Sequence, residues 1–412
     1  MTRLLLITYY FPPCGGAPVQ RWLRLLPHLV NRGCEITVIT TQEGDYPFID
    51  ESLIQQIPES VKVIRTPVYN TSRLWKLIFG SGSNQPYGTL SSQNMSFIHK
   101  ILLWIRLNII IPDIRIIWNP SAYKAAAEEI KAGVYDAIIT TGPPHSTHFV
   151  GMRLKKNLHV PWIADFRDPF REIHYLNLAN PSLLTRQVYR KLERKLVATA
   201  DLVLTVSESI KKRLPEGNKE VIYNAYEPHD FAGCSYQESP MFRIKYVGQI
   251  TAGQDFRLIT EFARKVCNLS GYDLTFIGTR LDSQQQNQLS AIHQDRIRIT
   301  GFLTHDQAVK ELVDADALLL IVNDTIGSSG ILTTKLFEYL ASRTPILCFS
   351  PVVGEAARII EQCGAGKVFT YKQIDDAIVW IVSLSKGTKH DGNIDPYSVE
   401  YQADKLIDEL NR

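Results

Sequence analysis

Residues 2–33 read TRLLLITYYFPPCGGAPVQRWLRLLPHLVNRG. The stretch opens with a short apolar run at Leu4–Thr8, which has the length of a buried strand. A loop rich in proline and glycine follows, and Gln20–Asn31 then forms a helix-length segment. Gly33 lies just past that segment, in the position where a left-handed backbone commonly ends a helix. These residues therefore predict a strand, a loop and a helix in succession.

The same alternation continues along the chain in two series. The first contains strand-length runs at Leu4–Thr8, Glu35–Thr40, Val61–Thr66, Ala137–Thr141, Trp162–Asp165 and Leu202–Val206, and helices at Gln20–Asn31, Ala122–Ala132 and Leu183–Ala200. The second contains strands at Arg243–Val247, Asp273–Ile277, Arg296–Thr300, Ala317–Val322 and Ile346–Phe349, and helices at Leu258–Asn268, Asp306–Val313, Thr334–Ser342 and Gly354–Gln362. Buried runs between helices are typical of a parallel sheet covered on both faces. We therefore predict an α/β protein with two doubly wound, Rossmann-like domains.

The boundary between the two series falls in a stretch rich in Glu, Gly, Ser and Pro, as interdomain linkers often are. We expect an N-terminal domain at residues 1–228, a linker at 229–241, a C-terminal domain at 242–390 and a final segment at 391–412. In that segment, Asp395–Arg412 is predicted to be a helix with its apolar residues, Tyr401 among them, largely on one side. Two facing domains of this type form a cleft at the carboxyl ends of their strands, where ligands bind.

The composition excludes several classes of protein. The chain has 412 residues, of which 45% are hydrophobic and 21% charged, and its net charge of +3 gives no electrostatic case for binding nucleic acid. The six cysteines lack the spacing of zinc ligands, and Asp314 and Asp316 lie at the amino end of a strand, so no metal site is predicted. The N-terminal run is too short for a signal peptide, and polar residues interrupt the most apolar stretch, Phe97–Trp118. We expect a cytoplasmic protein with reduced thiols.

Three segments of the N-terminal domain carry candidate functional groups. Gly15 and Gly16 allow a ligand close to the backbone at a helix start, or they form a plain turn. His145 follows a strand and is either an acid, base or substrate contact or a structural residue. Arg167 and Asp168 follow another strand, where charges are costly unless they are paired or used. They either bind or activate a polar substrate, or Arg167 forms a structural ion pair with a neighbouring aspartate.

In the C-terminal domain, a loop of Ser, Gly and Thr residues leads into the helix that begins at Thr334. Amide groups near Thr333, Thr334 and Lys335 can hold a diphosphate, and the lysine adds positive charge. Glu338, one turn later, can accept hydrogen bonds from two ribose hydroxyls. The alternative is that Thr333 caps the helix and that Lys335 and Glu338 form a surface pair.

Several segments occur in a set order along the chain. They are residues 10–16 (YFPPCGG), 31–38 (NRGCEITV), 200–207 (ADLVLTVS), 221–226 (VIYNAY) and 335–347 (KLFEYLASRTPIL). Together they resemble the retaining glycosyltransferases of family 4, which have the GT-B fold. Residues 112–118 (PDIRIIW) and 164–169 (ADFRDP) resemble a bacterial branch of that family that assembles envelope or capsular polysaccharides.

The resemblance implies transfer of a hexosyl group from a nucleotide-sugar donor to a saccharide or lipid-linked acceptor, with retention of configuration and without a metal or cofactor. In such proteins the second domain binds the donor, and the last helix commonly crosses back to the first domain. The residues expected to contact the donor are Gly16, Gly248, Gln249, Thr333, Thr334, Lys335 and Glu338. The residues expected to act in catalysis are His145, Arg167 and Asp168.

The sequence departs from the family pattern at three places. Gly330 stands where many members have a glutamate, the segment from Gly248 to Arg257 lacks the usual Arg and Lys pair, and Arg167 stands where many have a histidine. These departures motivate an alternative hypothesis, a catalytically silent binding or scaffold subunit with the GT-B fold. A sugar-nucleotide epimerase of the same fold is a further alternative.

A separate hypothesis concerns membranes. Residues 66–124 contain six basic residues and a single acidic one, with three tryptophans among them. Such a mixture suits an anionic membrane surface, and a lipid-linked acceptor would require docking there. We therefore expect Lys100, Arg106, Trp104 and Trp118 on the acceptor and membrane side, and a peripheral location on the inner face of the cell membrane. The alternative is that these segments pack on the sheet and the charges are solvated.

Overall fold

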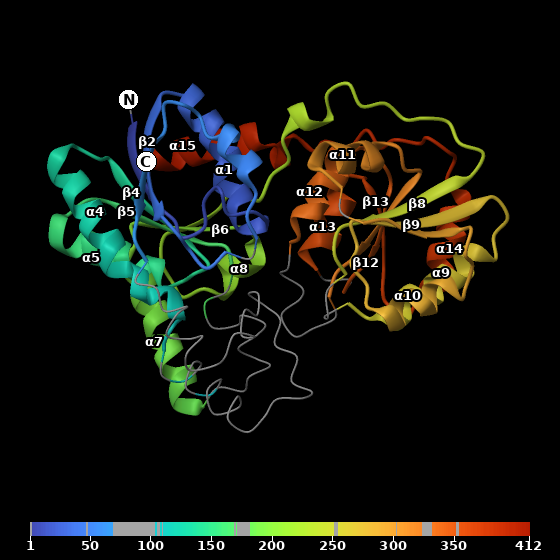
Figure 1. Cartoon of the computed structure of the whole chain (residues 1–412), viewed down its shortest axis with the longest axis horizontal. Helices are drawn as coiled ribbons and strands as arrows, with labels where there is room; N and C mark the ends of the chain where they lie inside the picture. The colour runs from blue at the N-terminus through green and yellow to red at the C-terminus, as the bar shows by residue number, and fades with distance from the viewer. Residues whose placement is uncertain are drawn as a thin grey trace. The chain divides into compact units, whose positions relative to one another are not determined.

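The chain forms two compact units, which are described here one at a time (Figure 1). The computed structural model describes residues 2–46, 48–68, 104, 108, 110–168, 170, 182–250, 254–301, 303–323, 332–351 and 354–412. The first unit comprises Met1–Tyr223 and Ala403–Arg412, and the second comprises Asn224–Gln402. Residues 229–241, the expected linker, thus group with the second unit, and the C-terminal residues group with the first.

The first unit is built on a seven-stranded parallel sheet in the order β3-β2-β1-β4-β5-β6-β7. Its strands are β1 (Thr2–Ile7), β2 (Cys34–Thr41), β3 (Lys62–Thr66), β4 (Ala137–Gly142), β5 (Trp162–Phe166), β6 (Leu202–Thr205) and β7 (Lys219–Val221). Its helices are α1 (Ala17–Asn31), α4 (Asn119–Ala132), α5 (Thr147–Leu158), α7 (Leu183–Thr199), α8 (Glu208–Arg213) and the C-terminal part of α15 (Val399–Leu410). Short 3₁₀ helices occur at Glu51–Gln56 and Ile114–Trp118.

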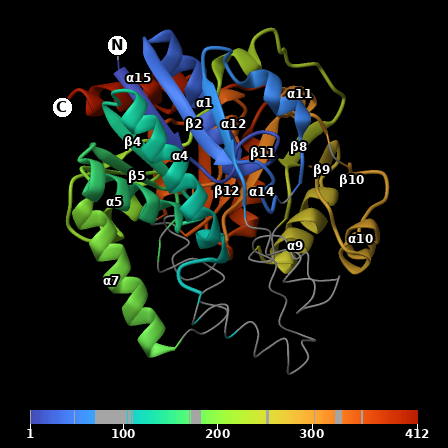
Figure 2. The same ribbon diagram turned by 60° about the vertical axis from the view of Figure 1, so that its left-hand side comes forward.

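The direction of the chain reverses in the middle of this sheet. The chain passes from β1 to β2 in one direction and from β4 to β5 in the other. Because crossovers between parallel strands are right-handed, α1 and α5 pack on opposite faces, and α4 lies beside α5 (Figure 2). The loops that leave the carboxyl ends of β1 and β4 therefore diverge, and such a switch point is where sheets of this type bind ligands.

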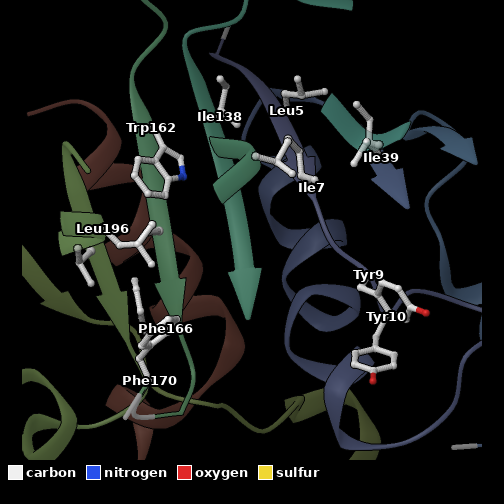
Figure 3. Packing of buried hydrophobic residues seen from close by; sticks show 14 of the residues in the cluster. Leu5, Ile7, Tyr9, Tyr10, Ile39, Ile138, Trp162, Phe166, Phe170 and Leu196 are labelled. Carbon is white, nitrogen blue, oxygen red and sulfur yellow. The ribbon is translucent and has the colours of Figure 1, made fainter. Parts of the chain in front are cut away.

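The core of the first unit contains two fully buried tryptophans. Trp162 on β5 donates its indole N–H to Thr140 Oγ1 at 2.8 Å, and Trp118 donates its own to Thr66 Oγ1 at 2.8 Å. A buried N–H without a hydrogen-bond partner destabilises the fold, and the two threonine hydroxyls offset this cost because they accept the indole N–H groups. Figure 3 shows Trp162 and Phe166 on β5, with Phe166 toward the carboxyl end of the strand.

The second unit is built on a six-stranded parallel sheet in the order β10-β9-β8-β11-β12-β13. Its strands are β8 (Phe242–Val247), β9 (Tyr272–Ile277), β10 (Ile297–Ile299), β11 (Ala317–Ile321), β12 (Ile346–Phe349) and β13 (Gly366–Phe369). Its helices are α9 (Phe256–Cys267), α10 (Ser283–Ser290), α11 (His305–Val313), α12 (Thr334–Ala341), α13 (Glu355–Gln362) and α14 (Ile374–Ser383), with 3₁₀ helices at Pro228–Phe231 and Asp395–Tyr397. Its switch point lies between β8 and β11. The two parallel sheets with their helices confirm the predicted α/β fold.

The C-terminal helix differs from the prediction at its start. The predicted helix Asp395–Arg412 is interrupted at Ser398, whose extended backbone separates a 3₁₀ turn from α15. The Ser398 hydroxyl accepts a hydrogen bond from the main-chain N–H of Tyr401 at 3.2 Å and so begins the new helix. Tyr401, expected on the apolar side, is 49% exposed, whereas Ala403 and Leu406 are fully buried.

Lysine contacts attach α15 to the last strand of the first unit. Lys405 Nζ donates to the carbonyl oxygen of Val221 at 2.9 Å and lies 2.7 Å from Glu220 Oε1. Lys211 of α8 lies 2.7 Å from the other oxygen of Glu220. Partial burial raises the pKa of Glu220, but the two lysine hydrogen bonds outweigh it and lower that pKa to about 2.

Candidate functional site

Gly16 lies in the loop that leaves β1, at the switch point of the first unit. Its φ of 93° is a conformation that favours glycine, and it precedes α1 without a side-chain cap. A Cβ on the neighbouring Gly15 would lie 2.2 Å from the ring of Phe48. The glycine pair therefore has a packing role, because it lets the ring of Phe48 lie on the loop.

His145 lies in the second loop of this switch point, after β4. Its ring is 2% exposed and its centroid lies 5.1 Å from that of Phe170 and 5.8 Å from that of Phe166. Burial, together with His148, holds the pKa of His145 well below its usual range. Neither ring nitrogen of His145 has a hydrogen-bond partner among the residues that the structure describes. His145 is thus a buried, neutral group that does not carry charge near neutral pH.

His148 is a neighbouring buried imidazole with a structural contact. Its Nδ1 lies 2.9 Å from Thr140 Oγ1, and its ring stacks on Phe166 with a centroid distance of 4.3 Å. Burial lowers the pKa of His148 to about 3. Both histidines are therefore neutral in the folded protein.

Asp165, at the end of β5, belongs to a buried ion pair with α1. Its carboxylate accepts hydrogen bonds from Arg21 Nε and Nη2, both at 3.1 Å, and from Trp22 Nε1 and Thr141 Oγ1, both at 2.9 Å. The hypothesis that Arg167 forms a structural pair with a neighbouring aspartate is therefore wrong for Asp165. The Asp165 carboxylate is fully buried and accepts four hydrogen bonds from side chains of the same unit, as expected for a structural residue.

Arg167 links the loops of the first switch point. Its Nη1 donates to the carbonyl oxygen of Pro18 at 2.5 Å, and its main-chain N–H donates to Gly142 at 3.2 Å. Pro18 is in the first turn of α1, and Gly142 ends β4. Asp168, the next residue, is exposed. The structure thus brings Arg167 next to the loops of Gly16 and His145.

In the second unit, the structure brings together predicted residues that are far apart in the sequence. Lys335, in the first turn of α12, donates from Nζ to Tyr246 Oη at 2.8 Å and to the carbonyl oxygen of Gln249 at 3.0 Å. The ammonium also lies 4.3 Å from the centre of the Tyr246 ring. Burial lowers the pKa of Lys335 to about 8, although the charge of Glu338 acts in the opposite direction. A cation is therefore held at the switch point between β8 and β11.

Gly248 and Gln249 lie directly against the side chain of Lys335. Gly248 has a φ of 105°, and a Cβ there would lie 2.5 Å from Lys335 Cε. Gln249 accepts the main-chain N–H of Arg280 on Oε1 at 3.0 Å, and Thr279 donates from Oγ1 to the carbonyl oxygen of Gly248 at 2.7 Å. A larger residue at position 248 would force the end of the Lys335 side chain to shift, and the positive φ also favours glycine.

Thr333, Thr334 and Glu338 are placed around the start of α12. Thr333 occupies the N-cap position with an extended backbone, as the alternative had it, but its hydroxyl makes no capping hydrogen bond. Thr334 begins the helix and Glu338 lies one turn along, half-buried. Lys335 turns to the β8 loop. Among the described residues, no hydrogen bond is made by the Thr333 or Thr334 hydroxyl at the start of the helix.

Asp314 and Asp316 have structural partners, as interpreted from the sequence. Asp316 is fully buried and accepts hydrogen bonds from Tyr236 Oη at 2.7 Å and from the main-chain N–H of Arg243 at 2.7 Å. Asp314 lies 2.6 Å from Arg243 Nη1. Over the described ranges, no group of three or more His, Cys, Asp or Glu residues has the arrangement of a metal site.

The residues predicted on the membrane side have different positions. Trp118 is 0% exposed and packs edge-on against Tyr9, so its predicted role at a membrane is wrong: the ring fills the core. Trp104 is 54% exposed. Lys100 and Arg106 lie outside the described residues. Within the described chain, no helix combines the length and the apolar character required to cross a membrane.

Two residues of these sites, Arg21 and Tyr246, were not predicted. Arg21 lies four and eight positions before Leu25 and Leu29, which are both buried, so it falls on the inner stripe of its helix. A charge on that stripe is a signal of a buried partner. Tyr246 carries no such signal, because an aromatic residue in a strand is ordinary core.

The first unit matches a known family. Residues 16–218 match the model of the Glycosyl transferase 4-like domain. No curated protein matches the sequence significantly.

Solved structures with the same fold cover the whole chain. The lipopolysaccharide outer core galactosyltransferase WaaB is 14% identical, with a TM-score of 0.61 over 99% of both chains. TarM from S. aureus, in complex with fondaparinux, α-GlcNAc-glycerol and UDP, is 11% identical, with a TM-score of 0.63 over 100% of both. HepE from Anabaena, in complex with UDP and glucose, is 13% identical, with a TM-score of 0.61 over 100% of both. The two-domain fold is that of the GT-B glycosyltransferases, and the family match supports a glycosyltransferase of the family 4 type.

Proposed function

We propose that this chain transfers a sugar from a nucleoside diphosphate sugar to an acceptor hydroxyl, and that the donor diphosphate binds at the switch point of the second unit. The observation that carries the proposal is the contact of Lys335 with the Gln249 loop. It places a cation next to the start of α12, and helix amides together with a cation are a common diphosphate site. The leaving diphosphate gains charge in the transition state, and fixed donors around it lower the barrier.

The electrostatics of Lys335 support an anionic ligand. Burial disfavours its charged form, as the pKa of about 8 indicates. A diphosphate beside the ammonium would reverse that effect, since an opposite charge favours the charged form. Thr333 and Thr334 would add hydroxyl contacts, and Glu338 would accept hydrogen bonds from the ribose.

In the first unit, the proposed catalytic residues are His145, Arg167 and Asp168. We propose that His145, a neutral imidazole whose ring nitrogens have no hydrogen-bond partner among the described residues, orients a hydroxyl group rather than carrying charge. Arg167 would supply positive charge to the reacting groups, and the exposed Asp168 would contact the acceptor.

Finer features of the proposal come from the family. We propose a hexosyl transfer with retention of configuration, independent of metal and cofactor, onto a saccharide or lipid-linked acceptor in envelope polysaccharide assembly, on the cytoplasmic side of the membrane. The name of WaaB, a lipopolysaccharide outer core galactosyltransferase, supports the hexosyl transfer and the polysaccharide role in this proposal. TarM and HepE, which hold UDP with a sugar or sugar derivative, support the nucleotide-sugar donor. Full activity in excess chelator would support the metal-independent chemistry, and the anomeric configuration of the product, measured by NMR, would test retention.

The first experiment is a thermal-shift screen against nucleoside diphosphates and their sugars, followed by an assay of diphosphate release. A ligand at about 100 times its dissociation constant should stabilise the protein by about 2.7 kcal/mol. Lys335→Met should lose that shift, whereas Lys310→Met, which removes an exposed charge from the same unit, should keep it. Absence of any shift would favour the silent subunit, and epimerised donor without released diphosphate would favour the epimerase.

A further inference from the structure

The exposed side of α7 carries an unusual concentration of positive charge. Arg186, Arg190, Lys191, Arg194 and Lys195 are all exposed, and the acidic residue of the helix, Glu193, is 2% exposed. Positions four apart share a helix face, so these residues form two adjacent rows. We call them the α7 basic strip.

These charges differ from several other basic residues of the same unit, which are paired. Lys62 pairs with Glu129, Lys155 with Asp201 and Lys211 with Glu220, each at 2.7–2.8 Å. Within the described part of the chain, by contrast, the side chains of Arg190, Lys191, Arg194 and Lys195 form no hydrogen bond or ion pair. Like charges at this spacing destabilise a helix. The strip therefore adds repulsion that an anionic partner would relieve.

Exposed apolar side chains lie at the N-terminal end of the same helix. Leu183 is 79% exposed and Leu184 is 72% exposed. These are the first two residues of α7, and in both views this end of the helix lies farther from the sheet than its C-terminal end (Figures 1 and 2). An exposed pair of leucines at the end of a basic helix makes the surface amphipathic along its length.

Hydrogen bonds hold a third apolar residue near this end. Asn108 Oδ1 accepts from the main-chain N–H of Ser182 at 3.0 Å and from Thr185 Oγ1 at 2.7 Å. Asn108 Nδ2 donates to the carbonyl oxygen of Trp104 at 2.9 Å, and Trp104 is 54% exposed. Leu183 and Leu184 of α7, together with Trp104, whose main-chain carbonyl is linked to this end of the helix through Asn108, are called the apolar tip.

We propose that the α7 basic strip and apolar tip form a docking surface for an anionic lipid bilayer. Basic side chains are attracted to anionic headgroups, and tryptophan and leucine insert at the boundary between headgroups and acyl chains. A nucleic acid would use the charges but would leave the two leucines without a role. The biological meaning rests on the proposed lipid-linked acceptor, but vesicle binding needs neither donor nor acceptor.

Co-sedimentation of the full chain with vesicles tests this surface. The vesicles contain phosphatidylcholine alone, or phosphatidylcholine mixed with phosphatidylglycerol. The wild type should bind the mixed vesicles more tightly, and added salt should weaken that binding. Removal of four charges in R190Q/K191Q/R194Q/K195Q should weaken it at least about tenfold. Leu183→Ser with Leu184→Ser should weaken the part of the binding that persists at high salt.

The matched control removes four exposed charges elsewhere, at Lys156, Lys212, Arg264 and Lys310, each replaced by Gln. It should bind as the wild type does. Equal binding by the α7 variant and the control, or binding of RNA but not of vesicles, would overturn the proposal. All variants should keep the nucleotide-dependent thermal shift, so a failure to dock is distinguishable from a failure of the donor site.

Discussion

Arg21 and Asp165 form a two-point ion pair inside the first unit, with side-chain exposures of 2% and 0%. The same guanidinium donates from Nη1 to the carbonyl oxygens of Ile222 and Tyr223, at 2.8 and 3.2 Å. Tyr223 is the last residue of the first unit before the chain enters the second. The pair thus joins α1, β5 and the exit of the chain, which explains a charged residue on the inner face of an otherwise apolar helix.

Replacement of Asp165 by Asn should be strongly destabilising. The change keeps the shape of the side chain but leaves the Arg21 charge buried without its counterion, which costs about 3–5 kcal/mol. Urea denaturation measures the loss. Asp168→Asn removes the same charge from an exposed side chain and should change stability by less than about 0.5 kcal/mol. Similar losses for the two variants would contradict the assignment of Asp165 as structural.

Donor binding should weaken at alkaline pH. Lys335 loses its charge as the pH rises through about 8, so the dissociation constant of a nucleoside diphosphate should rise by up to about tenfold per pH unit above that value. A bound anion favours the protonated lysine, and the midpoint in the complex should therefore be higher. Isothermal titration at several pH values measures it. Lys335→Arg stays charged, so the dissociation constant of this variant should no longer depend on pH in this range. If the variant shows the same pH dependence as the wild type, Lys335 is not its cause.

Gly248→Ala should damage the donor site more than the fold. The new Cβ would lie 2.5 Å from Lys335 Cε and push the ammonium away from the Gln249 loop. Backbone strain at this φ costs about 1–3 kcal/mol. Gly271→Ala is the matched control, because Gly271 also has a positive φ, 81°, but has open space around it. Both variants should lose similar stability, and only Gly248→Ala should lose nucleotide affinity. Equal affinities would contradict the proposed position of the lysine.

Glu220→Gln should loosen the attachment of α15. At neutral pH the wild type gains stability because its two lysine contacts lower the pKa of Glu220 to about 2. After allowance for solvent screening, the variant should lose about 1–2 kcal/mol. The folded pKa lies below the unfolded one, so this stability is present above the unfolded value and disappears as the pH falls toward 2. Urea denaturation at several pH values should show the two proteins converging in acid, and a constant difference would exclude this explanation.

The sequence allowed the sheets to be predicted where strands are apolar and bounded by loops. Runs such as Ile346–Phe349 are buried on both faces, and they can be recognised in the sequence because all their residues are apolar. The sequence ranges did not include strands β7 and β13 or helices α8, α10 and α14. Strand β7 and helix α10 are largely polar, and α10 buries only Leu289, whereas β13 and α14 contain apolar residues but are short. Such elements form because neighbours supply their contacts, which local patterns do not record.

The sequence identified candidate residues of the site, but it did not predict which of them contact one another. Lys335 follows a loop rich in small polar residues, and that local pattern is visible in the sequence. Its contact with Tyr246 and Gln249 depends on the order of strands β8 and β11, which the alternation of elements does not give. Trp118 shows the opposite error, since an aromatic residue among basic ones suggested a surface whereas its indole fills the core.

The contact between Lys405 and Val221, described with α15, also has a consequence in time. The two residues are 184 positions apart, yet both belong to the first unit. A ribosome adds about 5–20 residues per second, so Lys405 is synthesised about 10–40 s after the strand that contains Val221. Throughout that interval the whole second unit is being synthesised. The unit that is made first is therefore the last to be completed. Until α15 is synthesised, the edge strand β7 of the N-terminal sheet lacks its contacts with Lys405.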